Sequence, residues 1–155
     1  MNTTHEPAKS SPFNSFLSKF LEKNRLPLII FFSALLLFVI GYIVVSERMD
    51  SRIEKSTLMA EQMQDTYLKW LSAEESEKAE YEETLVTLHD SILETYPKLY
   101  ASQRARFVLG DLYYEKGEWE KSINEYASLA DSFPESYIAL PSLMNAGAAS
   151  EELGN

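Results

Sequence analysis

An apolar stretch near the start of the chain interrupts an otherwise mixed pattern of polar and apolar positions. Leu26 to Val45 is a run of twenty residues without a charge. In a helix such a run rises about 30 Å, which matches the hydrocarbon layer of a bilayer. A cleaved secretory signal has a shorter apolar core, of roughly 7–15 residues, and a small-x-small cleavage site, which Ile43 to Glu47 does not offer. The pattern predicts a transmembrane helix over residues 26–46 that anchors the chain in lipid.

Two shorter segments precede this span. Residues 1–12 are polar and contain two prolines, so we expect a disordered cytoplasmic arm there. Over residues 13–25, phenylalanine and leucine recur at helical spacing between charged side chains. This pattern predicts an amphipathic lead-in at the membrane interface, and a plain extension of the membrane helix fits it equally well.

Residues 47–100 are expected to form a juxtamembrane helix and a first divergent helical hairpin. A heptad-like seam with steps of four and three residues runs along the first part: Met49, Ile53, Ser56, Ala60, Met63, Tyr67 and Trp70. This spacing is typical of a coiled coil, and it predicts either a dimeric stalk or a face that packs on the next helix. That next helix follows a glutamate-rich stretch, which we interpret as a solvated helix end, and it stops at Pro97.

Residues 101–136 carry the clearest helical pattern. Apolar positions recur at spacings of three and four on both sides of Gly117, and the second run ends at Pro134. Two helices of about 14 residues joined by a glycine turn form an antiparallel hairpin.

Landmark residues recur at an offset of 37 positions. The pairs are Pro97 and Pro134, Gly110 and Gly147, and Gly117 and Gly154. A period between 20 and 50 residues is the signature of a solenoid, whose units stack because none can bury its own apolar face. Residues 137–155 are therefore expected to be the first helix of a further, incomplete repeat, in a chain truncated at its carboxyl end. A natural end with an unpaired capping helix is the alternative.

The predicted fold class is therefore all-α. It consists of a single amino-terminal transmembrane helix, a juxtamembrane helix, and helical hairpins that stack as an α-solenoid.

The best-defined unit resembles a tetratricopeptide repeat. The positions that carry the resemblance have the mutual spacings of that family: Leu109, Gly110, Tyr113, Gly117, Trp119, Ile123, Tyr126 and Pro134, with Gly147 and Gly154 in the next copy. The sequence departs from the family pattern at Arg106, Ser122 and Leu129, and in its longer period. The resemblance covers residues 101–155 well and 58–100 loosely, and it implies helical hairpins that bind other proteins.

The whole arrangement, an amino-terminal anchor followed by degenerate repeats, is similar to the bacterial ancillary SecYEG translocon subunit (YfgM-like) family. This similarity implies a single-pass protein of the bacterial inner (cytoplasmic) membrane whose repeats lie in the periplasm, near the translocon or periplasmic chaperones. It implies a non-enzymatic scaffold for protein–protein interactions. Other anchored repeat proteins of the envelope fit this architecture nearly as well.

The first helices of tetratricopeptide repeats form the inner wall of the solenoid. The resemblance places five residues of this chain on that wall: Arg104, Phe107, Asp111, Tyr114 and Glu115. Phe107 and Tyr114 would give a peptide or partner helix apolar contact, and Arg104 and Asp111 would orient it. The alternative is that the same side chains pack on further repeats. Trp119 is expected in the core rather than in ligand contact.

Charge bears on both orientation and partners. Four lysines and arginines lie within residues 1–25 and three follow the span closely, which favours a cytoplasmic amino terminus by a small margin. Residues 47–155 carry ten basic and twenty-two acidic residues, a net charge of −12, which disfavours nucleic-acid partners. A second function hypothesis is a self-associating structural envelope protein, a homodimer formed through residues 49–70.

The sequence contains no recognisable catalytic or metal-ligating pattern. The chain has no cysteine, and neither His5 nor His89 has the serine–carboxylate pair of a catalytic triad or a metal-ligand partner at a recognisable spacing. A glycine-rich phosphate loop is also missing. We therefore expect no enzymatic activity, no cofactor and no metal, and we expect His89 to be structural.

Overall fold

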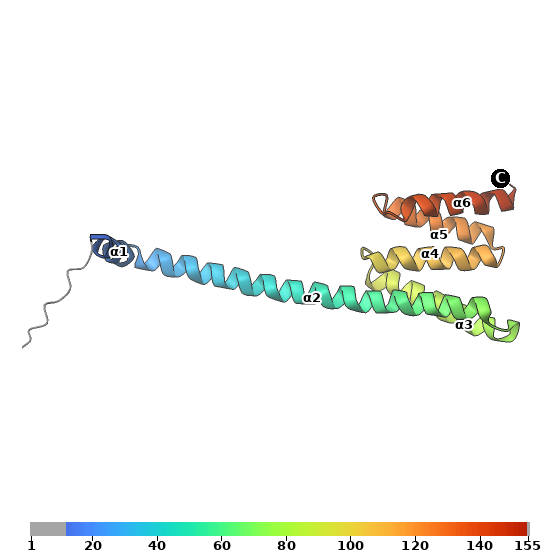
Figure 1. Cartoon of the computed structure of the whole chain (residues 1–155), viewed down its shortest axis with the longest axis horizontal. Coiled ribbons are helices and arrows are strands. Elements are labelled where there is room, and N and C mark those ends of the chain that lie inside the picture. The colour runs from blue at the N-terminus through green and yellow to red at the C-terminus, as the bar shows by residue number, and fades with distance from the viewer. Residues whose placement is uncertain (1–11, 155) are drawn as a thin grey trace, which may run out of the picture. The chain divides into compact units, whose positions relative to one another are not determined.

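The structure, a computed structural model, describes residues 12–154. Within this range it contains six α-helices and no strand: α1 Pro12–Lys23, α2 Arg25–Ser72, α3 Glu75–Thr95, α4 Tyr100–Glu115, α5 Trp119–Ser132 and α6 Ala139–Leu153 (Figure 1). The prediction of an all-helical chain is confirmed for these residues. The chain divides into two compact units, Met1–Arg48 and Met49–Asn155, and the division falls within α2.

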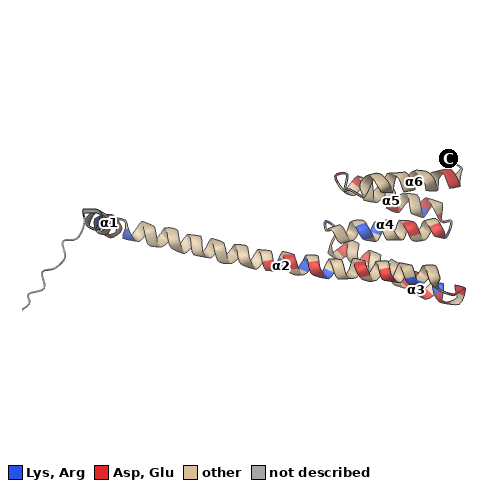
Figure 2. Cartoon of the chain, in the orientation of Figure 1, with Lys and Arg blue, Asp and Glu red and all other residues tan. Residues whose placement is uncertain are grey.

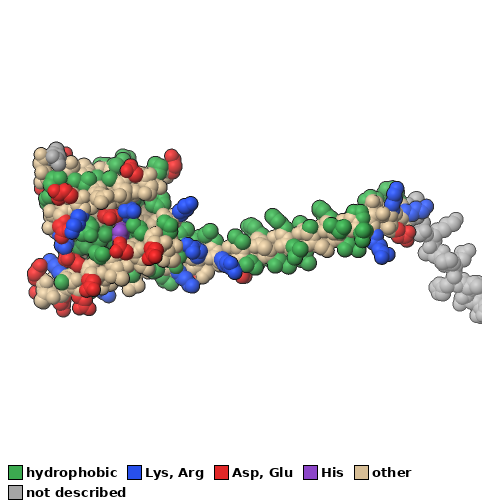
Figure 3. Space-filling model, turned by 180° about the vertical axis from the view of Figure 1, so that it is seen from behind, with side chains coloured by type: hydrophobic (Ala, Val, Ile, Leu, Met, Phe, Trp, Pro, Cys, Tyr) green, Lys and Arg blue, Asp and Glu red, His purple; other side chains and the backbone are tan. Residues whose placement is uncertain are grey.

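The amino-terminal unit holds α1 and the apolar part of α2. By length and composition α2 contains a stretch able to cross a membrane, and none of this stretch is buried. Its large apolar side chains are exposed (Figure 3), and no charged residue interrupts it (Figure 2). The coarser prediction, one helix near the amino terminus that is long and apolar enough to span a bilayer, is confirmed within the described residues.

The predicted lead-in is a separate helix, α1, and not a plain extension of α2. Asn24 lies between the two helices, and its side-chain amide donates a hydrogen bond to the carbonyl oxygen of Phe20 at 2.9 Å. Of the predicted arm over residues 1–12, only Pro12 lies inside the described range, where it begins α1.

The carboxyl-terminal unit packs the last turns of α2 against α3 and α4. The shared core joins apolar side chains of all three helices: Ala60, Met63, Tyr67 and Trp70 from α2, Leu85 and Ile92 from α3, and Ala101, Ala105, Val108, Leu109 and Leu112 from α4. The seam along α2 is therefore a packing face over Ser56 to Trp70. Only its first two members, Met49 and Ile53, remain about half exposed, at 47% each.

Two loops of this unit have the same conformation at an offset of 37 residues. Tyr96 and Phe133 are the C-caps of α3 and α5, with φ/ψ values of −129°/44° and −137°/60°. In each loop the N–H three residues later donates to the cap carbonyl oxygen, from Leu99 at 3.0 Å and from Ser136 at 2.9 Å. The proline that follows each cap cannot continue the helix. The two loops then diverge, because α4 begins at Tyr100 after an extended N-cap and α6 begins only at Ala139 after a helical one.

The ends of α4 and α6 repeat as well. Gly117 and Gly154 follow these helices with φ of 71° and 84°, a left-handed conformation that glycine adopts without a steric penalty. The helix starts also meet, because the hydroxyls of Tyr100 and Tyr137 share a hydrogen bond and their rings stack at 5.9 Å between centroids. Residues 37 positions apart therefore have matching local structure, as the sequence offset predicted.

The contact between α4 and α5 is close because Gly110 has no side chain. A Cβ at this position would lie 2.7 Å from Cε1 of Tyr126, whose side chain is fully buried. Beside it, the hydroxyl of Ser122 donates to the carbonyl oxygen of Gly110 at 2.9 Å. The serine that departs from the family pattern is thus accommodated by a buried hydrogen bond.

Candidate partner-binding groove

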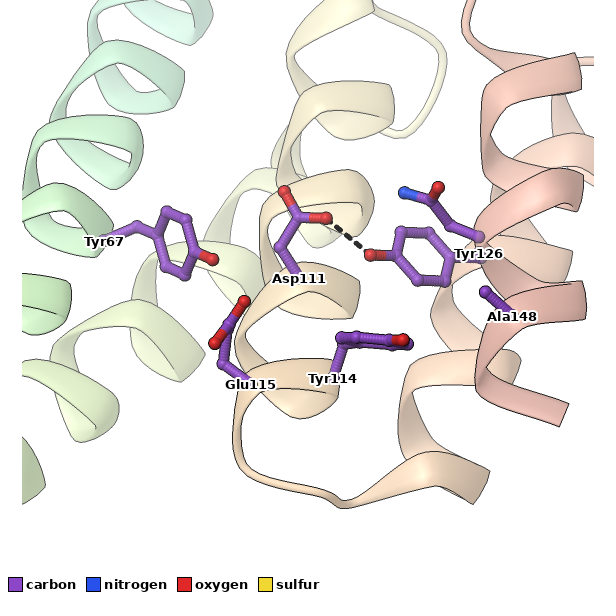
Figure 4. Close-up of a pocket in the computed structure, with 7 residues that line it drawn as sticks. Tyr67, Asp111, Tyr114, Glu115, Tyr126 and Ala148 are labelled. Atoms are coloured by element: carbon purple, nitrogen blue, oxygen red, sulfur yellow. Dashed lines mark hydrogen bonds between the residues drawn. The ribbon is translucent and has the colours of Figure 1, made fainter. Parts of the chain in front are cut away.

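One face of the carboxyl-terminal unit is hollowed where four helices meet (Figure 4). The cavity has a volume of about 280 Å³ and seven lining residues: Tyr67 of α2, Asp111, Tyr114 and Glu115 of α4, Tyr126 of α5, and Asn145 and Ala148 of α6. Tyrosine rings and carboxylates make up most of this lining. The cavity is therefore both aromatic and acidic.

Asp111 is the most perturbed acid in this lining. The hydroxyl of Tyr126 donates to its Oδ1 at 2.5 Å, as the dashed line in Figure 4 marks. Burial raises the pKa of Asp111 to about 6, because the hydrogen bond from Tyr126, which lowers it, does not offset burial and the nearby charge of Glu115. Near neutral pH the cavity consequently holds a carboxylate whose charge is poorly solvated.

Burial and the charge of Asp111 also raise the pKa of two tyrosines of the cavity, Tyr67 and Tyr126. Burial, followed by the negative charges of Asp111 and Glu115, raises the pKa of Tyr67 to about 12. Burial and the hydrogen bond to Asp111 raise the pKa of Tyr126 above its ordinary value. Both phenols therefore stay protonated and can donate hydrogen bonds, and neither can serve as a base near neutral pH.

A smaller cavity of about 120 Å³ lies along the same helices. Its lining consists of Gln64 of α2, Tyr100, Arg104, Phe107 and Val108 of α4, and Ile138 at the N-cap of α6. The ring of Phe107 meets the ring of Tyr126 edge to face, at 5.5 Å between centroids, and so connects the linings of the two cavities. We refer to the two cavities together as the α4 groove.

All five residues that the sequence placed on an inner wall line the α4 groove. Asp111, Tyr114 and Glu115 line the larger cavity, and Arg104 and Phe107 line the smaller one. Their role in binding stays a prediction. Trp119, which was expected in the core, is half-buried and packs against the ring of Tyr114 at 5.1 Å between centroids.

Sequence reasoning missed the groove residues that come from other helices. Tyr67 was placed only on the α2 seam and Tyr126 only among the structural residues of the repeat, whereas both line the larger cavity. Asn145 was not singled out at all. The 37-residue offset offered a signal for α6, because Asn145 corresponds to Val108 of α4, which lines the smaller cavity.

His89 belongs to a separate buried cluster. Its ring nitrogens lie 2.9 Å from Asp90 and 3.2 Å from Glu125, and Glu125 also accepts a hydrogen bond from Arg106 at 2.8 Å. Burial lowers the pKa of His89, but the hydrogen bonds to Glu125 and Asp90 outweigh it and the net pKa is raised. Arg106, which departs from the repeat pattern, is thus an ion-pair partner that ties α4 to α5.

The described part of the chain holds no group of three His, Cys, Asp or Glu side chains that could bind a metal ion.

Comparisons with protein-family models, with curated proteins and with solved structures find no match to this chain. The resemblance to tetratricopeptide repeats therefore rests on the residues and the repeated local geometry alone.

Proposed function

We propose that this chain is a non-enzymatic, membrane-anchored scaffold with tetratricopeptide-like hairpins that stack as an α-solenoid. Its α4 groove binds a peptide or helix of a protein partner, and the stretch Leu26–Val45 holds it in the lipid bilayer. Its architecture resembles the YfgM-like family, and we propose a corresponding place in the bacterial cell envelope, near the translocon or periplasmic chaperones.

The observation that carries this proposal is the groove itself. Two cavities line up on one helix, α4, with walls from α2 and α6, and they combine aromatic rings with both signs of charge. Concave surfaces with aromatic anchors and a few charged groups are typical of sites that bind peptides and helices. The repeated loops at Tyr96 and Phe133 support stacked hairpins, in which such a groove follows from the arrangement of the first helices.

Photo-crosslinking in native membranes tests the binding function. Benzoylphenylalanine in place of Phe107 or Tyr114 is expected to give discrete adducts with a partner, and in place of Val86, an exposed residue of α3, to give none. Arg104→Glu should weaken the Tyr114 adduct, whereas Lys98→Glu, a matched charge reversal outside the groove lining, should leave it unchanged. Equal adducts from groove and α3 positions would refute a specific groove.

The proposed location is the bacterial inner membrane, with a cytoplasmic amino terminus and a periplasmic carboxyl-terminal unit. Its support is the small excess of lysine and arginine before the span. Alkaline phosphatase, which is active only after export, tests this orientation when fused after residue 155, with a fusion before residue 26 as the inactive control. An inactive enzyme at the carboxyl-terminal site would reverse the topology.

Dimerisation through residues 49–70 has weaker support. Ser56, Ala60, Met63, Tyr67 and Trp70 are already buried within the carboxyl-terminal unit. A dimer through this seam would have to use the few members that remain exposed, which is too short a stripe for a coiled coil.

A further inference from the structure

We propose that the larger cavity of the α4 groove holds a positively charged side chain, an arginine or a lysine, of the protein partner. This inference rests on the proposed function, because it names the part of a partner that the groove recognises. It follows from unpaired carboxylates, from aromatic walls and from the size of the cavity.

Asp111 differs from the other partly buried carboxylates of the unit. Glu82, Glu118 and Glu125 each have a lysine, arginine or histidine nitrogen 2.5–3.2 Å away. Within residues 12–154, no such nitrogen lies within 4.0 Å of a carboxylate oxygen of Asp111 or Glu115. The fold thus pairs its other partly buried acids and leaves Asp111, with the exposed Glu115 beside it, without a cation.

Most acceptor sites of the two carboxylates are also open. Oδ1 of Asp111 accepts the hydroxyl of Tyr126, whereas Oδ2 of Asp111 and both oxygens of Glu115 accept no hydrogen bond from the described residues. A guanidinium group has five N–H donors and an ammonium group has three, and both bind carboxylates in charge-assisted hydrogen bonds. A partly buried carboxylate without a cationic partner is costly, so a cation that reaches Asp111 gains more there than at the exposed surface.

Aromatic rings complete a lining that suits a cation. Tyr67, Tyr114 and Tyr126 come from three different helices and surround the carboxylates in Figure 4. Tyrosine faces attract cations, and arginine stacks on them more readily than lysine does. The volume of about 280 Å³ lies just below the range of about 300–1,000 Å³ that is usual for small-molecule pockets, so it fits one long side chain.

Other occupants match the lining less well. An anionic side chain would face Asp111 and Glu115 and be repelled. A divalent metal ion usually takes six or more ligands, and no third acidic or histidine side chain joins the two carboxylates within the described chain. The preference is confined to the larger cavity, because Arg104 lines the smaller one.

The test uses the full chain in nanodiscs of zwitterionic phosphatidylcholine, which does not attract cations by net charge. The probe is n-propylguanidinium, a mimic of the arginine side chain, and its neutral isostere n-propylurea is the matched control. Tyrosine labelled with ¹³C in the ring reports binding by NMR. We expect saturable shifts of Tyr67 and Tyr126 with propylguanidinium and no shift with propylurea at equal concentration.

Variants locate the binding to the two carboxylates. Glu115→Gln and Asp111→Asn should each weaken propylguanidinium binding about tenfold, because each removes one charge and keeps the shape of the side chain. Glu120→Gln, at an exposed position of α5 outside the cavity lining, should leave the binding unchanged. Glu115 is itself exposed, so its variant is expected to fold even if the Asp111 variant does not.

The pH profile gives an independent readout. The groups that face Asp111 across the cavity are Tyr67 from α2, Glu115 from α4, Tyr126 from α5 and Asn145 from α6. Because the pKa of Asp111 is raised to about 6, binding should weaken as the pH falls from 7.5 to 5.0. Asp111→Asn should remove most of this dependence.

Three results would overturn the inference. They are equal shifts with propylurea, unchanged affinity in both carboxylate variants, and Mg²⁺ binding to the same tyrosines in preference to propylguanidinium. The proposed function fails separately. If Phe107 gives crosslinks but propylguanidinium does not bind, the scaffold proposal stands and only the preference for a cation is refuted. Propylguanidinium binding without any crosslinked protein would remove the scaffold role.

Discussion

The close approach of α4 and α5 at Gly110 leads to a quantitative prediction for Gly110→Ala. The new Cβ would lie 2.7, 2.9 and 3.0 Å from three ring atoms of Tyr126. The ring cannot move aside easily, because it is fully buried, its hydroxyl is held by Asp111 and it packs in a T-shaped contact with the ring of Phe107. Overpacking of this kind costs about 1–3 kcal/mol. Alanine recovers about 0.5–1 kcal/mol of helix propensity, so we expect a net loss of about 1–2 kcal/mol.

Gly147→Ala is the matched control. Gly147 lies 37 residues further on, within α6, and a Cβ there would meet nothing within 4 Å. The helix-propensity gain is the same and the clash is missing, so this variant should be more stable than the wild type by about 0.5–1 kcal/mol. The difference between the two alanine variants then isolates the cost of the helix contact.

Urea unfolding of the full chain in mild detergent, followed by tryptophan fluorescence, measures both variants. Trp70 and Trp119 are the two tryptophans of the chain and both lie in the carboxyl-terminal unit, so the signal does not come from the apolar part of α2. With a slope of about 1–3 kcal/mol per molar urea, the Gly110→Ala midpoint should fall by about 0.5–1 M. In a Tyr126→Leu background the same change should cost little, since the clashing ring is gone. Equal midpoints for Gly110→Ala and Gly147→Ala would refute the close crossing.

The same assay checks three further expectations. Ser122→Ala removes a fully buried hydrogen bond to an α4 carbonyl and should cost about 1 kcal/mol, whereas Ser128→Ala, at a less buried site of α5, should stay within about 0.5 kcal/mol. Glu125→Gln should cost about 2 kcal/mol at pH 7, because it leaves His89 and its arginine neighbour without their shared carboxylate. Stability should also decrease from pH 5 to pH 8. The pKa of His89 is raised in the folded state, so its contacts stabilise the fold while the ring is protonated and are lost as the ring loses its proton. The pKa of Asp111 is raised to about 6, so its ionisation as the pH rises also lowers the stability of the folded state. Stability that rises over this range would contradict the raised pKa of both groups. Asp111→Asn should make the stability less dependent on pH near pH 6.

The elements of this fold were predictable because their signals are local. Gly117 and Pro134 act on their own backbone, one by permitting a left-handed turn and the other by removing an N–H donor, so each marks a helix end without reference to the rest of the chain. The long helix α2 was predictable because no glycine or proline occurs between the apolar span and Ser72 to end it. The uncertain point was the seam along α2, whose spacing suits an external partner and an internal helix alike.

The groove was only half predictable. Its α4 residues could be placed because they share one helix, and helical spacing puts Phe107, Asp111 and Tyr114 on one side. Tyr67 enters the same cavity from α2, and this depends on the register between helices, which periodicity does not specify. The cluster of His89, Arg106 and Glu125 shows the same limit: its members are up to 36 residues apart, and sequence alone gave the histidine no partner.

For a related reason, the sequence does not show which acidic residues have a cationic partner in the fold and which do not. Twenty-two acids are spread over residues 47–155, and their spacing does not distinguish Glu125 from Glu115. In the folded unit Glu125 meets two cationic side chains from other positions, whereas Glu115 meets none within the described residues. A carboxylate that the fold pairs is part of its stability, because removing either partner leaves a buried charge. A partly buried carboxylate that the fold leaves without a cation costs stability unless something else neutralises it. Asp111 is such a carboxylate, so Asp111, with the exposed Glu115 beside it in the cavity, is the acid with which a basic partner is expected to interact.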